Sequence, residues 1–211
     1  LTVISTGNEL ADIDEPLSGS KIRDINAYAL AAEAVSNGFR VRKKIRVPDD
    51  ETMIFEAVSK AAAESDIVLL SGGSSKGSRD YTKSVLERVT QNVFTHGISV
   101  KPGKPTILSV ERERRVIIAG LPGHPMAALL MFRLLILDWY RQKAGIAAPK
   151  PYFAVMQENV SSNQGRAACL PVRLVCGETD YGALPVYAKS GSISALSKAD
   201  GYVMIPRNKE G

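Results

Sequence analysis

The chain has 211 residues, of which 45% are hydrophobic and 23% charged, a composition typical of soluble globular proteins. Its net charge of +5 is dispersed and its aromatic content is only 6%, which argues against a nucleic-acid-binding surface. Its longest apolar stretch, within Met126–Tyr140, is interrupted by Arg133 and Asp138 and so predicts a buried helix, not a membrane span. We expect a cytoplasmic protein, because the first residues do not resemble a signal peptide.

The segment up to residue 70 alternates strand and helix patterns. Leu1–Ser5 is a short apolar run that predicts a strand, and Phe39–Val47 alternates like a second strand. Glu51–Ser65 predicts an amphipathic helix, and Asp66–Leu70 predicts a strand buried on both faces of a parallel sheet. A further helix is predicted over Asn26–Asn37, whose buried face would hold Ala27, Leu30, Ala31, Ala34 and Val35.

The same alternation continues to residue 145. A helix is predicted from Tyr81 to Arg88, and a longer one from Pro125 to about Lys143. Strands are predicted at Val93–Val100, Thr106–Ser109 and Val116–Ala119. This pattern predicts an α/β domain over residues 1–145, a three-layer sandwich with a mostly parallel sheet.

A linker at Gly145–Pro151 separates this domain from a different pattern. Helical periodicity is absent after the linker, so residues 152–211 predict a small all-β domain. Cys169 and Cys176 lie on opposite faces of one predicted strand and therefore predict two free thiols. The predicted strands are Tyr152–Met156, Ala168–Val175, Leu184–Tyr187 and Gly201–Ile205.

Turns rich in glycine or proline follow three predicted strands, at Thr6–Glu9, Ser71–Asp80 and Gly120–Pro125, and a fourth turn, Lys101–Pro105, precedes a strand. Open parallel sheets bind ligands at the carboxyl ends of their strands. Glycine lets backbone N–H groups converge on an anion, and a helix that follows adds its positive end. Each turn alone is more simply an ordinary connection, but together they predict an anion pocket. Countercharge would come from Lys76, Lys101 and Lys104.

Three acidic residues, Glu9, Asp49 and Asp80, stand beside these turns. Carboxylates next to a phosphate pocket suit a hard cation such as Mg²⁺. Simpler roles are also open: Glu9 would be solvated, and Asp49 and Asp80 would cap the helices that follow them, which is the favoured role for Asp49 alone. His96 and His124 do not have a metal-ligand spacing. These residues predict an anion-binding α/β enzyme or binding protein.

Several motifs resemble the molybdopterin-binding fold shared by MogA, MoeA and gephyrin, in the same order and with similar spacing. They are Ser5–Leu10, Asp24–Asn26, Ser71–Gly77 with Asp80–Thr82, Val100–Pro105 and Gly120–Pro125. In the second part, Ser190–Ser192 and Ala199–Pro206 resemble the C-terminal β domain of MoeA, which MogA-type adenylyltransferases generally lack. The resemblance favours a MoeA-type molybdopterin molybdotransferase.

The resemblance implies an enzyme of molybdenum cofactor biosynthesis that binds adenylylated molybdopterin, inserts molybdate and releases AMP. It implies that Glu9, Asp49 and Asp80 hold Mg²⁺ or molybdate and assist cleavage of the pyrophosphate link. It also implies a homodimer in the full-length protein, and Arg173 and Ser192 are candidates to reach the cleft. The positions that would bind the pterin phosphate and the adenylate are Thr6, Gly7, Asn8, Ser71, Gly72, Gly73, Ser74, Ser75, Lys76, Gly77, Lys101, Pro102, Gly103, Lys104, Pro122 and Gly123.

Other interpretations stay open. One is a MogA-type adenylyltransferase, against which the β segment after Tyr152 argues. Another is a non-catalytic sensing or scaffold module, against which the retained Glu9 and Asp80 argue, and a remote one is a nucleotide-cleaving CinA relative. Family members carry two further N-terminal domains, so the chain is expected to be a fragment with an incomplete β domain. Departures from the family pattern occur at Ser74, Lys76, Ser78 and His124.

Overall fold

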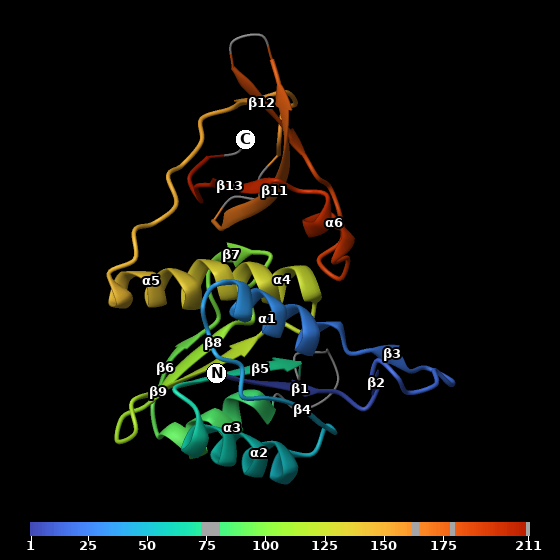
Figure 1. The fold of residues 1–211 in the computed structure, drawn as a ribbon, viewed down its shortest axis with the longest axis vertical. Coiled ribbons are helices and arrows are strands. Elements are labelled where there is room, and N and C mark those ends of the chain that lie inside the picture. The colour runs from blue at the N-terminus through green and yellow to red at the C-terminus, as the bar shows by residue number, and fades with distance from the viewer. Residues whose placement is uncertain (73–80, 162–164, 178–179, 210–211) are drawn as a thin grey trace.

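A computed structural model describes residues 1–72, 81–161, 165–177 and 180–209 of the chain. Figure 1 shows a larger α/β domain and, stacked on it, a smaller β domain that contains the C-terminal part of the chain. Residues 145–154 form neither helix nor strand and lead from one domain to the other.

The α/β domain is built on a six-stranded sheet with the order β4-β1-β5-β9-β8-β6. The first four of these strands are parallel, so the prediction of a mostly parallel sheet is confirmed. β8 runs antiparallel to β9, and β6 runs antiparallel to β8. Because β4, β1, β5 and β9 point the same way, their carboxyl ends meet at one edge of the sheet. The strands are β1 (Thr2–Thr6), β4 (Lys43–Val47), β5 (Ile67–Gly72), β6 (Val93–His96), β8 (Ile107–Glu111) and β9 (Val116–Leu121).

One face of the sheet is covered by α1 (Ile25–Ser36) and by a long helix that starts as α4 (Pro125–Met131). This helix continues through a π-helical segment, η1 (Phe132–Leu137), into α5 (Asp138–Ala144), so the helix predicted after Pro125 is confirmed. The prediction for Val35 is wrong, since its side chain is 60% exposed. Val35 lies about 100° around the helix from the buried Ala34. The face of α1 that packs on the sheet is narrower than predicted and does not reach Val35. That face consists of Ala27, Leu30 and Ala34.

The opposite face is covered by α2 (Glu51–Glu64) and α3 (Tyr81–Thr90), which completes the predicted three-layer sandwich (Figure 1). The predicted apolar positions of α2, Ile54, Val58 and Ala61, are all buried. They pack against the continuous apolar run of β5, which is buried on both faces because helices cover both sides of it.

The β domain contains a five-stranded sheet, one strand of which comes from the α/β part of the chain. That strand is β7 (Val100–Lys101), which pairs with β11 (Ala167–Cys176). The single strand predicted at Val93–Val100 is therefore wrong: Gly97, with φ +86°, turns the chain from one sheet into the other. The remaining strands are β10 (Val155–Met156), β12 (Tyr181–Pro185) and β13 (Gly201–Ile205).

Smaller differences concern the ends of elements. The strands predicted at Phe39–Val47 and Tyr152–Met156 are shorter in the structure, and the one predicted at Leu184–Tyr187 starts and ends earlier, as β12. A short helix, α6 (Ser194–Ser197), interrupts the all-β pattern. Cys169 is buried and Cys176 exposed, and both are free thiols as predicted.

A narrow arm projects from the α/β domain (right in Figure 1). It contains β2 (Leu10–Ala11) and β3 (Ile22–Arg23), which pair in parallel as a separate ribbon. The arm leaves the sheet after β1 and returns directly into α1, so its base borders the carboxyl edge of the sheet. Within the described part of the chain, no helix combines the length and the apolar character needed to cross a membrane.

Candidate functional site

A cleft of ≈ 1200 Å³ lies at the carboxyl edge of the sheet and is lined by residues of both domains. The described parts of all four predicted turns contribute to it. From the β domain, Arg166 and the segment 188–191 complete the lining. The predicted site residues that line the cleft are Thr6, Glu9, Asp49, Ser71, Gly72, Lys101, Pro102, Gly103, Lys104, Pro122 and Gly123. The predicted residues Gly73, Ser74, Ser75, Lys76, Gly77 and Asp80 lie outside the described residues.

Gly7 and Asn8 do not line the cleft but position the acidic residues that do. The Asn8 amide donates to Asp49 Oδ2 at 3.4 Å, and the Asp49 amide donates to Asn8 Oδ1 at 3.1 Å. Gly7 has φ +155°, and a Cβ atom there would lie 2.7 Å from Glu9 Oε2. The missing side chain of Gly7 therefore leaves room for the Glu9 carboxylate, and this turn brings both acids to the same cleft.

The helix-capping role expected for Asp49 is wrong. Asp50 caps α2 instead, since its side chain accepts a hydrogen bond from the Met53 amide at 2.8 Å. Asp49 stands one residue before the cap, where its carboxylate accepts from Asn8 and lines the cleft. The side chain is thus available to a ligand without loss of the helix cap.

Two of the three predicted metal-binding acids, Glu9 and Asp49, can be placed, and the third, Asp80, lies outside the described residues. Among the residues whose positions are described, no group of three or more His, Cys, Asp or Glu side chains could hold a metal ion. Two carboxylates on neighbouring turns of one cleft nevertheless suit Mg²⁺, because this ion is typically bound through one or two carboxylates and keeps several waters.

The strand ends at the cleft are tightly packed. Gly72, the last residue of β5, has φ +123°, and a Cβ atom there would lie 2.2 Å from the backbone oxygen of Thr6. On the α1 side, Asn26 Nδ2 donates to Ser71 Oγ at 2.7 Å and to the Gly123 carbonyl at 2.8 Å. The hydrogen bonds of Asn26 thus join three segments that are far apart in the sequence.

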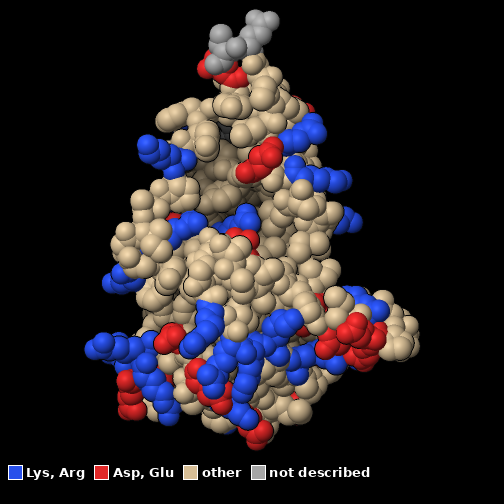
Figure 2. Space-filling view, viewed as in Figure 1, with Lys and Arg blue, Asp and Glu red and all other residues tan. Residues whose placement is uncertain are grey.

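Most of the visible basic surface lies away from this cleft. Lys and Arg gather over the lower part of the α/β domain, around β4 (Figure 2). Arg42 and Lys43 pair there with Glu64 at 3.1 Å and 2.9 Å, and hydrogen bonds from Lys43 and Arg42 lower the pKa of that carboxyl group. Exposed pairs of this kind contribute little stability. Net charge alone therefore does not locate the site, which depends on the few basic residues of the cleft.

The comparisons with known proteins divide the chain in two. Residues 2–142 match the family described as probable molybdopterin binding domain, and residues 154–211 match the MoeA C-terminal region, domain IV. The chain belongs to the molybdopterin-binding domain family. Its second part is a MoeA-type C-terminal region.

Relatives and solved structures agree with this assignment. The chain is 32% identical to a putative molybdopterin biosynthesis protein of Methanocaldococcus jannaschii, over 99% of the chain and 51% of that relative. It is 29% identical to a molybdopterin molybdenumtransferase of Synechocystis, over 99% of the chain and 52% of that relative. The crystal structure of a molybdopterin biosynthesis MoeA protein from Pyrococcus horikoshii aligns with TM-score 0.82 and 34% identity, covering 98% of the chain and 49% of that structure. The chain thus spans about half the length of the curated relatives it matches.

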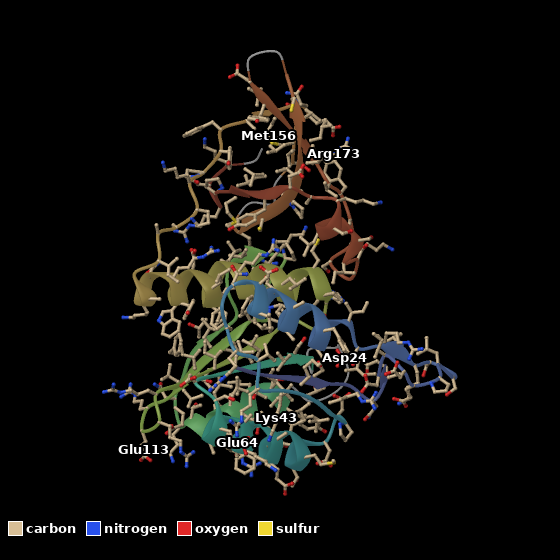
Figure 3. The ribbon with its side chains drawn as sticks, viewed as in Figure 1. Asp24, Lys43, Glu64, Glu113, Met156 and Arg173 are labelled. Carbon is tan, nitrogen blue, oxygen red and sulfur yellow. The ribbon has the colours of Figure 1, made fainter. Side chains whose placement is uncertain are left out.

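Sequence reasoning missed the contribution of the MoeA-type β region to the cleft of the molybdopterin-binding domain. Arg166, Lys189 and Ser190 line it, whereas the candidates Arg173 and Ser192 do not. Figure 3 places Arg173 high on the β domain, away from the cleft. The matched segment Ser190–Ser192 was a signal for the correct loop, but nothing local distinguished Arg166 from the other basic residues of this region.

Two hydrogen bonds connect the segment 188–191 of the β domain to the molybdopterin-binding domain. Ser190 Oγ lies 2.7 Å from His124 Nδ1, and the Met126 amide donates to the Ser190 carbonyl at 3.2 Å. The first turn of α4 is thus in contact with Ser190. The turn Lys101–Pro105 is held next to the β domain because β7, where this turn begins, pairs with β11. Both sides of the cleft are therefore held by contacts between the domains.

Proposed function

We propose that the chain contains the substrate-binding core of a molybdopterin molybdotransferase, which inserts molybdate into adenylylated molybdopterin and releases AMP. The observation that carries the proposal is one cleft lined by acids on neighbouring turns and by basic residues from both domains. The acids include Glu9 and Asp49, and the basic residues include Lys101, Lys104, Arg166 and Lys189. The names of the relatives support the same reaction.

The size of the cleft fits a ligand larger than a single nucleotide base. Its volume of ≈ 1200 Å³ lies above the range of about 300–1000 Å³ usual for small-molecule pockets. A pterin joined through a pyrophosphate to adenosine is an elongated ligand with a heterocycle at each end and anionic groups between them. A cleft that extends from the strand ends to the β domain has room for such a molecule.

The basic and acidic residues have separate tasks in this proposal. Cleavage of the pyrophosphate link develops charge on phosphoryl oxygens, which Lys101 and Lys104 would stabilise. Arg166 and Lys189 would attract molybdate, which is itself an anion. Glu9 and Asp49, with Asp80, would hold Mg²⁺, which supplies positive charge between carboxylate and phosphate. The proposal also includes a cytoplasmic location and a homodimer of the full-length protein.

Calorimetry with adenylylated molybdopterin, followed by chromatographic detection of AMP after addition of molybdate and Mg²⁺, tests the proposal. We expect binding by the chain, and AMP release that depends on both additions. Asp80→Asn should weaken Mg²⁺-dependent AMP release more than binding, whereas Lys101→Ala should weaken binding. Arg173→Ala, a change of charge outside the cleft lining, is the control and should alter neither.

Other outcomes would reject the transferase. Binding without AMP release would favour a non-catalytic binding or sensing module, and incorporation of AMP from ATP would favour an adenylyltransferase. Absence of binding would reject the substrate-binding core itself.

A further inference from the structure

The motif Asp24–Asn26 has no ligand role in the proposal above. Asp24 stands immediately before α1, at the point where the projecting arm rejoins the domain (Figure 3). It lines the cleft, and only 7% of its surface is exposed. A carboxylate buried to this degree is costly unless it has partners, so its hydrogen bonds show whether its role is only structural.

Asp24 uses one of its two carboxylate oxygens within the protein. Oδ1 accepts from the Ala27 amide at 3.0 Å, which caps α1, and from Ser5 Oγ at 3.1 Å. No described residue donates a hydrogen bond to Oδ2. A helix cap needs only one side-chain oxygen, which Ser, Thr or Asn also supplies. The second oxygen therefore exceeds what the cap requires, and it belongs to a residue that lines the cleft.

Asn26, two residues after Asp24, also has an acceptor oxygen without a partner. Asn26 donates its Nδ2 group to the Gly123 carbonyl, which can only accept, so the orientation of the amide is fixed. Its Oδ1 is then left without a partner, but this atom is buried from solvent, so the acceptor available to a ligand is Asp24 Oδ2. A free carboxylate oxygen selects a ligand group that donates hydrogen bonds. Arg23, beside Asp24, donates its Nη1 group to the carbonyls of Asp12 and Glu15 in the arm. The basic lining residues at positions 101, 104, 166 and 189 come from other segments and suit the anionic part of a ligand.

We propose that Asp24 recognises the donor edge of the pterin ring and determines the specificity of this cleft for a 2-amino-4-oxopteridine. In that heterocycle the 2-amino group and the ring N3–H lie side by side. Asp24 Oδ2 is an acceptor-only oxygen without a protein donor, and it can accept a hydrogen bond from this edge. The inference rests on the proposed function and extends it by assigning an orientation to the ligand in the cleft. The pterin lies against the start of α1, and its phosphate lies toward the lysines.

The test compares three probes: pterin, lumazine and pyrophosphate. Lumazine has a carbonyl group where pterin has the 2-amino group, so a carboxylate should repel it. We expect the wild-type chain to bind pterin at least about 10-fold more tightly than lumazine, as the loss of a hydrogen bond to a charged group predicts. Binding is measured by quenching of pteridine fluorescence and, for pyrophosphate, by calorimetry.

Asp24→Asn is the informative variant. Asparagine keeps one oxygen for the Ala27 amide but can place an N–H donor where Oδ2 stood. We expect pterin affinity to fall at least about 10-fold and the preference over lumazine to be lost or reversed. Pyrophosphate affinity should stay within about twofold, because charge-assisted contacts from the lysines are untouched. Asp50→Asn, which changes the cap of α2 outside the cleft lining, is the matched control and should keep the wild-type preference.

The results separate this inference from the function on which it rests. The inference is wrong, and Asp24 is only a structural cap, if Asp24→Asn keeps the wild-type preference for pterin. The same holds if the affinity of Asp24→Asn falls equally for all three probes. A wild-type chain that binds neither pteridine overturns the inference, and one that also fails to bind adenylylated molybdopterin overturns the proposed function. Selective pterin binding that depends on Asp24 supports the proposed role of this residue. If AMP release is absent in the same protein, the transferase function is rejected while the role of Asp24 stands.

Discussion

Replacement of Gly72 by alanine should destabilise the α/β domain through a contact that no side-chain rotation relieves. The added Cβ atom would lie 2.2 Å from the Thr6 carbonyl oxygen and 2.6 Å from Thr6 Oγ1, in a residue whose φ is +123°. An unfavourable φ costs about 1–3 kcal/mol, and an overpacked contact costs a further 1–3 kcal/mol or so. We therefore expect the free energy of unfolding to fall by roughly 2–6 kcal/mol in Gly72→Ala.

Gly38→Ala is the matched control. Gly38 also has a left-handed φ, +84°, but a Cβ atom there meets nothing within 4 Å. Gly38→Ala should lower the free energy of unfolding only through the unfavourable φ, by about 1–2 kcal/mol. Urea unfolding followed by circular dichroism gives both values, provided that each transition is two-state. If Gly72→Ala costs no more than Gly38→Ala, the ends of β1 and β5 do not approach as closely as the structure shows, and the shape of the cleft would need revision.

Two further predictions concern titration and thiol reactivity. Hydrogen bonds, first from Lys43 and then from Arg42, hold the pKa of Glu64 below its ordinary value, so its contribution to stability is present above about pH 4.5 and is lost as the pH falls below it. Melting temperatures from pH 6 to 3 should fall less steeply in Glu64→Gln than in the wild type or in Glu113→Gln, a control on the exposed β8–β9 turn (Figure 3), and equal slopes would contradict this. Burial raises the pKa of Cys169 to about 12, whereas Cys176 is exposed. At neutral pH, maleimide should therefore add one label to the native chain and two labels to the chain in urea, as counted by mass spectrometry. The native Cys176→Ser variant should not be labelled, and a label on it would show that Cys169 is accessible.

Patterns within short segments predicted the elements of this protein well where burial is uniform. Asp66–Leu70 is apolar throughout, and the structure places it in the centre of the sheet as part of β5. Ile54, Val58 and Ala61 recur at helical spacing and are buried as expected. Val35 was misplaced because periodicity defines the centre of a buried stripe better than its width. Asp49 was taken as a cap because adjacent acids offer the same local signal, and only the hydrogen bond to Met53 distinguishes Asp50.

The sequence by itself determined the α/β alternation, the glycine turns and the acids beside them, because each depends on residues close together in the chain. Only the tertiary structure decided that Arg166 and Lys189 line the same cleft as Lys101, and that β7 joins the sheet of the β domain. These are contacts between segments separated by tens of residues, and local periodicity contains no information about them. The second oxygen of Asp24 also became visible only in three dimensions, when Ala27 and Ser5 were both found on the first.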